Sequence, residues 1–342
     1  MKAIVKYKKP GFYEVVEKPV PEINKGEVLI KVRATGICHT DVSILENRYK
    51  GRKPVPIPVI LGHEGAGEIA EVKETKRPFM VGQRVGFEAL NGCGKCYFCR
   101  AGYKNMCNDW SHIGITQDGT FAEYIALPEE LVHPLPDGVT FSNAALLEPL
   151  SLVVRSLEHV KPEVGDSAVI IGPGSIGLLH LLALKSAGVS KIILIGIDKD
   201  IKKLEMARAL GADYTINSSK EDPVEKVMEI TKGMGTDIVI ETASSPVVWD
   251  FLLDLVAAKG RISCFGLHDK SNFRPLALIR KGVTLYGDVA FLTRHFLRAI
   301  KWLETGKVQG EAIITHRFSL EQAKQAFETY YKGNSAKIMF EM

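Results

Sequence analysis

The feature that most constrains the fold is a regular alternation of apolar runs and helical segments between about residues 167 and 287. The helical segments span residues 175–188, 199–211, 224–235 and 247–260. The apolar runs between them are SAVIIG, KIILIGID, DYTIN, TDIVIETA, RISCFG and VTLYGDV. Strands and helices that alternate at this spacing predict a parallel sheet with helices on both faces. The fold class of this region is therefore α/β, a doubly wound sheet of six strands.

The two ends of the chain have a different pattern. Residues 1–150 contain short strands broken by glycine and proline, which is typical of a β-rich, barrel-like domain. Residues 289–342 contain two helical segments, FLRAIKWLETG and LEQAKQAFETYYKG, and a closing strand, AKIMFEM. A chain of 342 residues is long for one domain, and two domains are expected.

A glycine-rich turn follows the first strand of the predicted parallel sheet. Residues 172–177, GPGSIG, match G-x-G-x-x-G, and Asp198 ends the next predicted strand. Any glycine-rich strand-to-helix turn can match by chance, but this context is the one that a dinucleotide site requires, because the glycines let the backbone approach a pyrophosphate. Asp198 would accept hydrogen bonds from the ribose and repel a 2′-phosphate, which favours NAD over NADP. The lysines that follow Asp198 either weaken this preference or form a solvated face of the next helix. The predicted cofactor contacts are Gly172, Gly174, Ser175, Ile176, Gly177, Asp198, Lys203, Gly266 and Leu267.

Four of the six cysteines lie within residues 92–107, GCGKCYFCRAGYKNMC. The C-x2-C-x2-C-x7-C spacing supplies enough thiolates to close a tetrahedral zinc shell, and a closed shell leaves no position for a substrate. Disulfides would need strained loops, and an iron–sulfur motif would have a proline where this chain has Asn108. The sequence therefore predicts a structural zinc. Its ligands would be Cys93, Cys96, Cys99 and Cys107. Cys264, in RISCFG, is expected to be inert core.

A second set of candidate ligands is spread along the chain. Cys38 lies in GICHTD, His63 and Glu64 lie in GHEG, and Glu148 lies among leucines in LLEPLS. Taken singly, Cys38 could be a small core residue, His63 a satisfied polar residue, and Glu148 a helix cap or an interdomain salt bridge. Together, a thiolate, an imidazole and a carboxylate make a plausible open zinc shell, whose fourth position is left for water or substrate. A buried Glu148 also needs a partner, which the metal or its water would provide.

Taken together, these motifs resemble the zinc-containing medium-chain alcohol and polyol dehydrogenases, including the sorbitol and threonine dehydrogenase branch. The resemblance runs from end to end and is carried by GICHTD, GHE, the cysteine cluster, GTFAEY, LLEPLS, GPGSIG and Asp198. It implies a GroES-like catalytic domain over 1–150 with a structural-zinc lobe at about 91–110, a Rossmann NAD-binding domain over 151–288, and a segment over 289–342 that completes the catalytic domain. It also implies a catalytic zinc held by Cys38 and His63, with Glu64 and Glu148 as exchangeable carboxylates or as groups just outside the ligand shell.

The predicted reaction is the oxidation of an alcohol, with two zinc ions per chain and NAD as cofactors. The metal would lower the pKa of the alcohol hydroxyl, and hydride would pass to NAD. Cys38 and one carboxylate already neutralise Zn²⁺, so Glu64 and Glu148 are expected to alternate in the shell. Thr40 matches the family's relay hydroxyl; alternatively it only caps the following helix.

The substrate motifs point in more than one direction. The GHE motif and Glu148 resemble the polyol branch, whereas C-H-T-D resembles the simple alcohol dehydrogenases. Threonine dehydrogenases of this kind have His at the position of Ser43 and usually Asp at that of Glu148, and GDVAFLTRHF lacks the Arg-Tyr pair of animal sorbitol dehydrogenases. The sequence favours a secondary alcohol, a polyol or diol, that is oxidised to a ketone. L-Threonine 3-dehydrogenase and simple alcohol dehydrogenase are the alternatives.

The composition argues against other classes of partner. Lys and Arg total 44 against 40 for Asp and Glu, a net charge of +4 that does not suggest nucleic acid or a membrane. A zinc-dependent nucleic-acid binder is the alternative from another class, but its cysteine pairs would lie further apart. The most apolar window, Val169 to Val189, is interrupted by polar residues, and no signal peptide is evident. We expect a cytoplasmic homo-oligomer, a dimer or tetramer, whose partner is a small-molecule alcohol.

Overall fold

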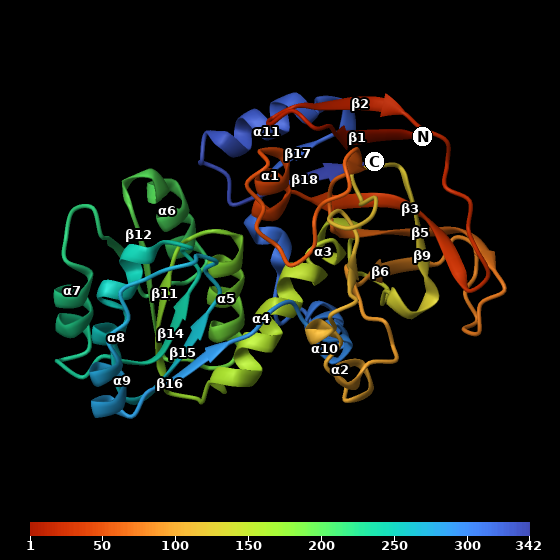
Figure 1. Ribbon diagram of the computed structural model, residues 1–342. Helices are drawn as coiled ribbons and strands as arrows, with labels where there is room; N and C mark the ends of the chain where they lie inside the picture. The colour runs from red at the N-terminus through yellow and green to blue at the C-terminus, as the bar shows by residue number, and fades with distance from the viewer.

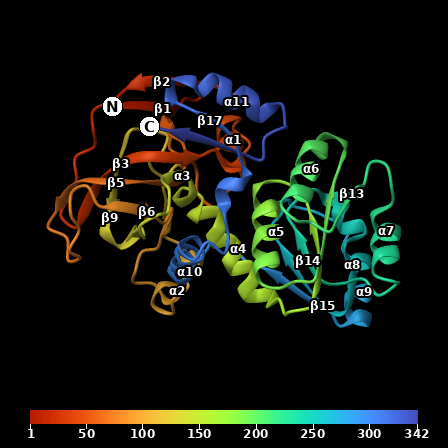
Figure 2. The ribbon, with the colours of Figure 1, turned by 180° about the vertical axis from the view of Figure 1, so that it is seen from behind.

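The computed structural model describes all 342 residues and contains two units that lie side by side (Figure 1). One unit is rich in strands and holds both the beginning and the end of the chain. The other is built on a parallel sheet, and α4 and α10 lie between the two (Figures 1 and 2). No helix in the structure has both the length and the apolar character that crossing a membrane requires.

The parallel sheet has six strands in the order β13-β12-β11-β14-β15-β16. This is the doubly wound order, and it confirms the six strands predicted from the apolar runs. Side chains alternate across the sheet, since Ala168 and Ile170 of β11 pack in one hydrophobic cluster and Val169 and Ile171 in another. The strands are β11 (Ser167–Ile171), β12 (Lys191–Gly196), β13 (Tyr214–Asn217), β14 (Thr236–Glu241), β15 (Val256–Cys264) and β16 (Thr284–Gly287).

Helices cover both faces of this sheet, as the alternation predicts. Residues of α4, α5 and α6 share a hydrophobic cluster with one face, and residues of α7, α8 and α9 pack on the other. These helices are α4 (Leu147–Val160), α5 (Ser175–Ser186), α6 (Ile201–Ala209), α7 (Pro223–Ile230), α8 (Leu252–Leu255) and α9 (Pro275–Lys281).

One predicted helix is wrong in its extent. Residues 247–260 do not form a single helix; a 3-10 helix, Pro246–Asp250, is followed by the short α8, and β15 begins at Val256. The reason is tertiary: Val256 pairs with Thr236 of β14, and the register then shifts before Arg261 pairs with Ile238. Lys259, with φ of 63°, lies in this irregular stretch, so the strand begins where the helical pattern predicted a last turn.

The strand-rich unit contains a seven-stranded sheet in the order β10-β6-β5-β3-β18-β17, with β9 also paired to β3. A three-stranded sheet, β2-β1-β4, and the pair β7-β8 complete it. The strands are β1 (Lys2–Lys6), β2 (Tyr13–Glu17), β3 (Glu27–Gly36), β4 (Val59–Ile60), β5 (Glu64–Lys73), β6 (Arg84–Phe87), β7 (Leu90–Asn91), β8 (Ser111–His112), β9 (Tyr124–Pro128), β10 (Val132–Pro134), β17 (Ile314–Phe318) and β18 (Lys337–Glu341). The helices are α1 (His39–Leu45), α2 (Tyr97–Arg100), α3 (Phe141–Ala144), α10 (Thr293–Glu304) and α11 (Ala323–Tyr331).

The last strand returns to the first part of the chain. β18 pairs antiparallel with β3, with Met339 opposite Gly36 and Phe340 opposite Thr35. In both views the blue C-terminal elements lie among the red N-terminal ones (Figures 1 and 2). The predicted division at residue 150 falls within α4, which contacts β5 on one side and α5 on the other. The C-terminal strand therefore helps to build the surroundings of residues 36–38.

Candidate functional site

Three of the predicted ligands meet where β3 ends and β5 begins. Gly36, the last residue of β3, pairs with Glu64, the first residue of β5, and Cys38 immediately precedes α1. One ligand atom from each of Cys38, His63 and Glu64 lies within 4.8 Å of the others. His63 and Glu64 are buried, and Cys38 is half-buried. The pairing of two strands therefore brings together residues that lie some 25 positions apart in the sequence.

Asp41 contacts the segments that carry Cys38 and His63. Its Oδ2 accepts a hydrogen bond from the backbone N–H of Cys38 at 2.8 Å, and its Oδ1 accepts one from Gly62 at 3.0 Å. The same Oδ1 lies 3.2 Å from Nδ1 of His63, an ionic contact that is not aligned as a hydrogen bond. Because Asp41 occupies the Nδ1 side, Nε2 of His63 remains for a metal. The sequence analysis missed this role, although a carboxylate three residues after a helix-capping position is a recognisable signal.

Lys337 is the second residue that the sequence analysis missed. It is the first residue of β18 and only 2% exposed, and its ammonium group forms an ion pair with Oε2 of Glu64. It also donates a hydrogen bond to the carbonyl of Ile37 at 3.1 Å. Burial lowers the pKa of Lys337, but Glu64 and Cys38 outweigh it and the net pKa is raised. The one lysine in the apolar strand AKIMFEM was the available signal.

Glu148 faces the same site from α4. It lies in the first turn of this helix, is 8% exposed and makes no hydrogen bond or salt bridge within the chain. Burial raises its pKa to about 7, opposed by His63 and reinforced by Glu64. The structure therefore places Glu148 near the three-residue group but outside it. Glu148 does not form an interdomain salt bridge, which was the alternative interpretation of this residue.

The structure also shows the environment of His63 and the position of Thr40. Burial opposes a charged His63, but Asp41 and Cys38 together raise its pKa well above the usual value, so a metal must displace a proton from this ring. Thr40 is the second residue of α1, whereas the residue at the capping position is Cys38 and the capping carboxylate is that of Asp41. The idea that Thr40 caps the helix is therefore wrong. Its half-buried hydroxyl makes no hydrogen bond within the chain.

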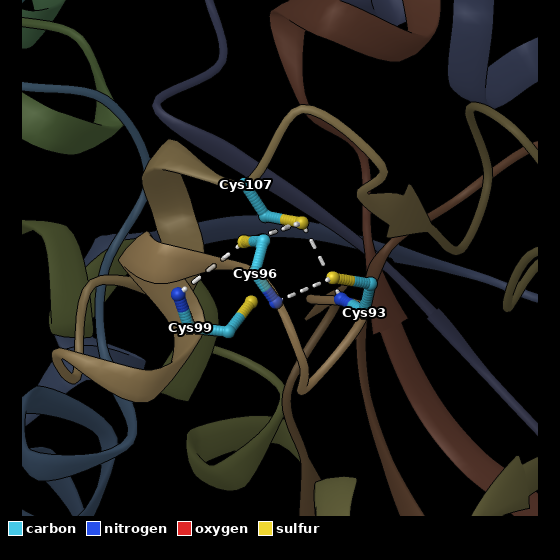
Figure 3. A group of neighbouring side chains, drawn as sticks. All are labelled: Cys93, Cys96, Cys99 and Cys107. Carbon is cyan, nitrogen blue, oxygen red and sulfur yellow. Dashed lines mark hydrogen bonds between the residues drawn. The ribbon is translucent and has the colours of Figure 1, made fainter.

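The four clustered cysteines converge in a separate lobe (Figure 3). One sulfur from each lies within 4.8 Å of the others, and all six cysteines of the chain are free, so the disulfide alternative is excluded. The sulfurs of Cys96 and Cys107 are 3.8 Å apart. Zinc–sulfur bonds of about 2.3 Å at tetrahedral angles place two sulfurs about 3.8 Å apart, so the cluster fits a zinc ion. Backbone N–H groups of Lys95 and Cys96 lower the pKa of Cys93 to about 6, whereas burial raises that of Cys99 to about 12.

A buried carboxylate connects this lobe to the rest of the unit. Glu88 is fully buried and accepts hydrogen bonds from Lys104 at 2.6 Å and Thr293 at 3.2 Å. Its second oxygen lies 2.9 Å from Nε2 of His133. Lys104 belongs to the cysteine lobe and Thr293 begins α10, so Glu88 links the lobe, the sheet and the C-terminal segment.

The glycine-rich turn has the geometry of a dinucleotide site. Gly172 has a φ of 102°, and a Cβ on Gly177 would lie 2.0 Å from the carbonyl oxygen of Gly172. Nothing lies within 4 Å of the position of a Cβ on Gly174, which directly precedes α5, so this side of the turn is open. Ser175 and Ile176 are the first residues of α5, and their backbone N–H groups are those that a pyrophosphate would meet.

The other predicted cofactor residues lie along the same edge of the parallel sheet. Asp198 follows β12, and its exposed side chain accepts a hydrogen bond from Asn217 at 2.8 Å. Lys203 lies 3.2 Å from Asp200. The N–H of Gly266 is already engaged by Glu241 at 2.8 Å, whereas the side chain of Leu267 is 85% exposed. The sequence analysis missed the buried Glu241, which holds the loops after β14 and β15 together.

A doubly wound sheet with an open glycine turn, beside a buried thiol–imidazole–carboxylate group, defines a metal-dependent dehydrogenase that uses a nicotinamide cofactor. The chain matches the alcohol dehydrogenase GroES-like domain over residues 24–137 and the zinc-binding dehydrogenase domain over residues 175–305. It is 34% identical to a sorbitol dehydrogenase of Halalkalibacterium halodurans, over 99% of this chain and 98% of that protein. It is 36% identical to an L-threonine 3-dehydrogenase of Pyrococcus horikoshii, over 99% and 98%. An Escherichia coli alcohol dehydrogenase structure complexed with NADH has a TM-score of 0.91 and 27% identity, over 100% of this chain and 99% of that one.

These matches run the length of the chain, which belongs to the zinc-containing medium-chain alcohol dehydrogenase family. The predicted combination of a GroES-like domain and a Rossmann domain is thereby confirmed. The protein is a zinc-dependent oxidoreductase of this family.

Proposed function

We propose that this chain oxidises a secondary alcohol, a polyol or diol, to a ketone at the site formed by Cys38, His63 and Glu64, and that the hydride passes to NAD. The observation that carries the proposal is the convergence of these three ligand types within 4.8 Å of one another, with Glu148 nearby. Thiolate, imidazole and carboxylate are the donors of zinc sites that keep one position open. The sorbitol dehydrogenase relative supports a polyol substrate.

The proposal assigns each zinc a ligand set. Cys38, His63 and a carboxylate from Glu64 or Glu148 would hold the catalytic ion. The structural ion would be held by the four-cysteine lobe, that is by Cys93, Cys96, Cys99 and Cys107. When bound, zinc supplies a Lewis acid that lowers the pKa of an alcohol hydroxyl.

We assign proton transfer and cofactor binding to the following side chains and backbone groups. The free hydroxyl of Thr40 would relay the proton: it would accept the proton that leaves the alcohol while its own proton passes on to solvent water. The open turn at Gly174 and the first N–H groups of α5 would hold the pyrophosphate of NAD. Asp198 would accept hydrogen bonds from the adenosine ribose, with Lys203 beside it. Gly266 and Leu267, in the loop that follows β15, would contact the cofactor. Asp41 would keep His63 oriented.

Two related reactions are tested alongside the proposed one. The Pyrococcus horikoshii relative favours L-threonine as an alternative substrate, although Ser43 stands where threonine dehydrogenases of this kind have His. The C-H-T-D motif at Cys38 favours a simple alcohol. NADH formation should be followed with sorbitol, 2,3-butanediol, L-threonine and ethanol, using Cys38→Ser as the inactive control. Turnover highest with a polyol or diol supports the proposal, and turnover confined to threonine or ethanol replaces it with one of the alternatives.

We further propose that the protein works as a cytoplasmic homo-oligomer, a dimer or a tetramer. The strand β16 lies at an edge of the parallel sheet, and α9 beside it exposes Leu276 at 57% and Ile279 at 70%. An unpaired sheet edge can pair with that of another chain, and neighbouring exposed apolar side chains can mark an interaction surface. Six free cysteines suit a reducing compartment. Light scattering of the purified protein tests the assembly, and a monomer at micromolar concentration would contradict it.

A further inference from the structure

The catalytic site contains a buried cation that the zinc chemistry does not itself require. Lys337 enters from the last strand of the chain and contacts Glu64, which is a member of the three-residue ligand group. Both side chains are only 2% exposed. A second contact, from Lys337 to the carbonyl of Ile37 at 3.1 Å, fixes the ammonium group beside the residue that precedes Cys38.

The Glu64–Lys337 pair lies directly against the backbone of Gly36. A Cβ on Gly36 would lie 2.3 Å from Oε2 of Glu64 and 2.7 Å from Cε of Lys337. The pair therefore occupies the space that a side chain at residue 36 would fill. Since β18 pairs with β3 at Gly36, the position of Lys337 is set by the sheet and not by a flexible loop.

Charge explains what this cation does. Cys38, Glu64 and Glu148 would each carry one negative charge in the ionised state, which exceeds the two positive charges of zinc. Lys337 supplies a third positive charge, which balances those of Cys38, Glu64 and Glu148. The charge of Asp41, which also lies in this site, is not in this count and is stabilised by the backbone N–H groups of Cys38 and Gly62. A shell that is net negative is a weaker Lewis acid, because the metal attracts electrons of the substrate oxygen less strongly.

We infer that Lys337 is a positioning residue for the catalytic zinc: it holds Oε2 of Glu64 and cancels its charge, so that Glu64 offers the metal at most its other oxygen. This inference rests on the proposed function, because it assumes a zinc ion at Cys38 and His63. It replaces the expectation that Glu64 and Glu148 must alternate on grounds of charge alone. With Lys337 present, Glu64 is restrained by its ion pair and Glu148 is the carboxylate without a partner.

The test compares Lys337→Met, which removes the charge, with Lys337→Arg, which keeps it. If Lys337 restrains Glu64, the Met variant should hold its labile zinc more tightly against a chelator, by about 10- to 100-fold, the range for groups that orient metal ligands. A merely structural role predicts the opposite sign, since a damaged site loses metal sooner. In the cobalt-substituted enzyme, the Met variant should keep the thiolate charge-transfer band and lose intensity in the d–d bands, as the coordination number rises. Lys337→Arg should resemble the wild type in both measurements.

The kinetic readout separates binding from chemistry. The Met variant should have a lower kcat, because the charge beside the ligand group is lost. The KM for NAD is measured with it, because Ala336, next to Lys337, accepts a hydrogen bond at 2.7 Å from Ser175 of the predicted cofactor turn. If Lys337→Met fails to fold, the double variant Lys337→Met/Glu64→Gln removes both charges and should recover folding. Failure of that double variant, or metal retention and cobalt spectra in Lys337→Met equal to those of the wild type, overturns the inference.

The proposed function fails in a distinguishable way. If the wild-type protein holds no zinc that a chelator removes, the metal is not at this site. The same conclusion follows if the labile zinc is still present in Cys38→Ser. If Cys38→Ser removes the labile zinc but Lys337→Met behaves like the wild type, the proposed catalytic site stands. Only the role of Lys337 is then contradicted.

Discussion

Asp41 lies 3.2 Å from His63 through Oδ1 and Nδ1, and both side chains are buried. The carboxylate of Asp41 also accepts hydrogen bonds from the backbone N–H groups of Cys38 and Gly62. One side chain thus connects the two segments that carry two of the proposed zinc ligands. The strands set the spacing of the ligands, and Asp41 holds the segments of Cys38 and His63 in their orientation.

The first prediction concerns Asp41→Asn. An amide must place its NH₂ group either against the N–H of Cys38 or against the N–H of Gly62 and Nδ1 of His63, so in either orientation one contact between donors becomes repulsive. We expect the affinity for the labile zinc to fall about 10- to 100-fold, as for other groups that hold metal-binding histidines. Competition with a chelator measures this directly. Asp109→Asn, at a side chain that is 79% exposed, is the matched control and should leave metal binding unchanged.

The second prediction separates the two zinc ions. Cys96 precedes α2, and its sulfur accepts a hydrogen bond from the N–H of Cys99. Serine is a favourable residue at this capping position, so Cys96→Ser keeps the cap and loses only the metal ligand. Since a structural zinc contributes to folding free energy, the variant should melt at a lower temperature or assemble poorly, while its folded fraction retains hydride transfer.

The control for this change is Cys264→Ser. Cys264 lies in β15, and burial raises the pKa of its thiol to about 12, so it stays protonated and takes no part in metal binding. Elemental analysis should find two zinc ions in the wild type and in Cys264→Ser, but one in Cys96→Ser. A stable Cys96→Ser protein without activity would mean that the roles of the two ions are reversed.

The sequence predicted the parallel sheet and the four-cysteine group for local reasons. Cys38, His63 and Glu64 lie apart in the sequence and were grouped by their chemistry and by the resemblance to a known family. Several of the six strands are short apolar runs that alternate with helical patterns, and the four cysteines lie within sixteen residues. Lys337 and Glu64 could not be paired in this way, because their contact depends on β18 joining β3 from the far end of the chain. The false helix over 247–260 has the same origin, since pairing of Val256 with Thr236 overrides a helical pattern. Long-range strand pairing is what a periodic pattern does not contain.

The third prediction concerns the choice of cofactor. Asp198 is exposed and accepts one hydrogen bond, from Asn217, so Asp198→Ala should change stability by less than about 0.5 kcal/mol. Removing the carboxylate removes repulsion of a 2′-phosphate, and the preference for NAD over NADP should narrow, mainly through KM. Initial rates with both cofactors measure the ratio. An unchanged ratio would show that Asp198 does not face the ribose.

The fourth prediction is a pH dependence that arises away from the metals. Burial lowers the pKa of His180 to about 4, although its Nδ1 lies 2.8 Å from the carbonyl oxygen of Ile176. The unfolded chain therefore binds the proton more readily, and stability rises with pH between about 4 and the unfolded value of about 6.5. Acidification through this window should remove up to about 3 kcal/mol. Thermal unfolding of His180→Leu should show a flatter profile there, and a profile parallel to that of the wild type would contradict the assignment.

The last prediction concerns Thr40, whose hydroxyl makes no hydrogen bond within the chain and does not cap α1. If this hydroxyl takes the proton of the alcohol, Thr40→Val should lower kcat/KM by about 10²- to 10⁴-fold, the usual contribution of general acid–base catalysis. Thr40→Ser keeps the hydroxyl and should lose much less. Because the capping contacts come from Cys38 and Asp41, the Val variant should melt close to the wild type and keep its zinc. Normal turnover in Thr40→Val, with zinc content and melting temperature preserved, would require the proton to leave through another group.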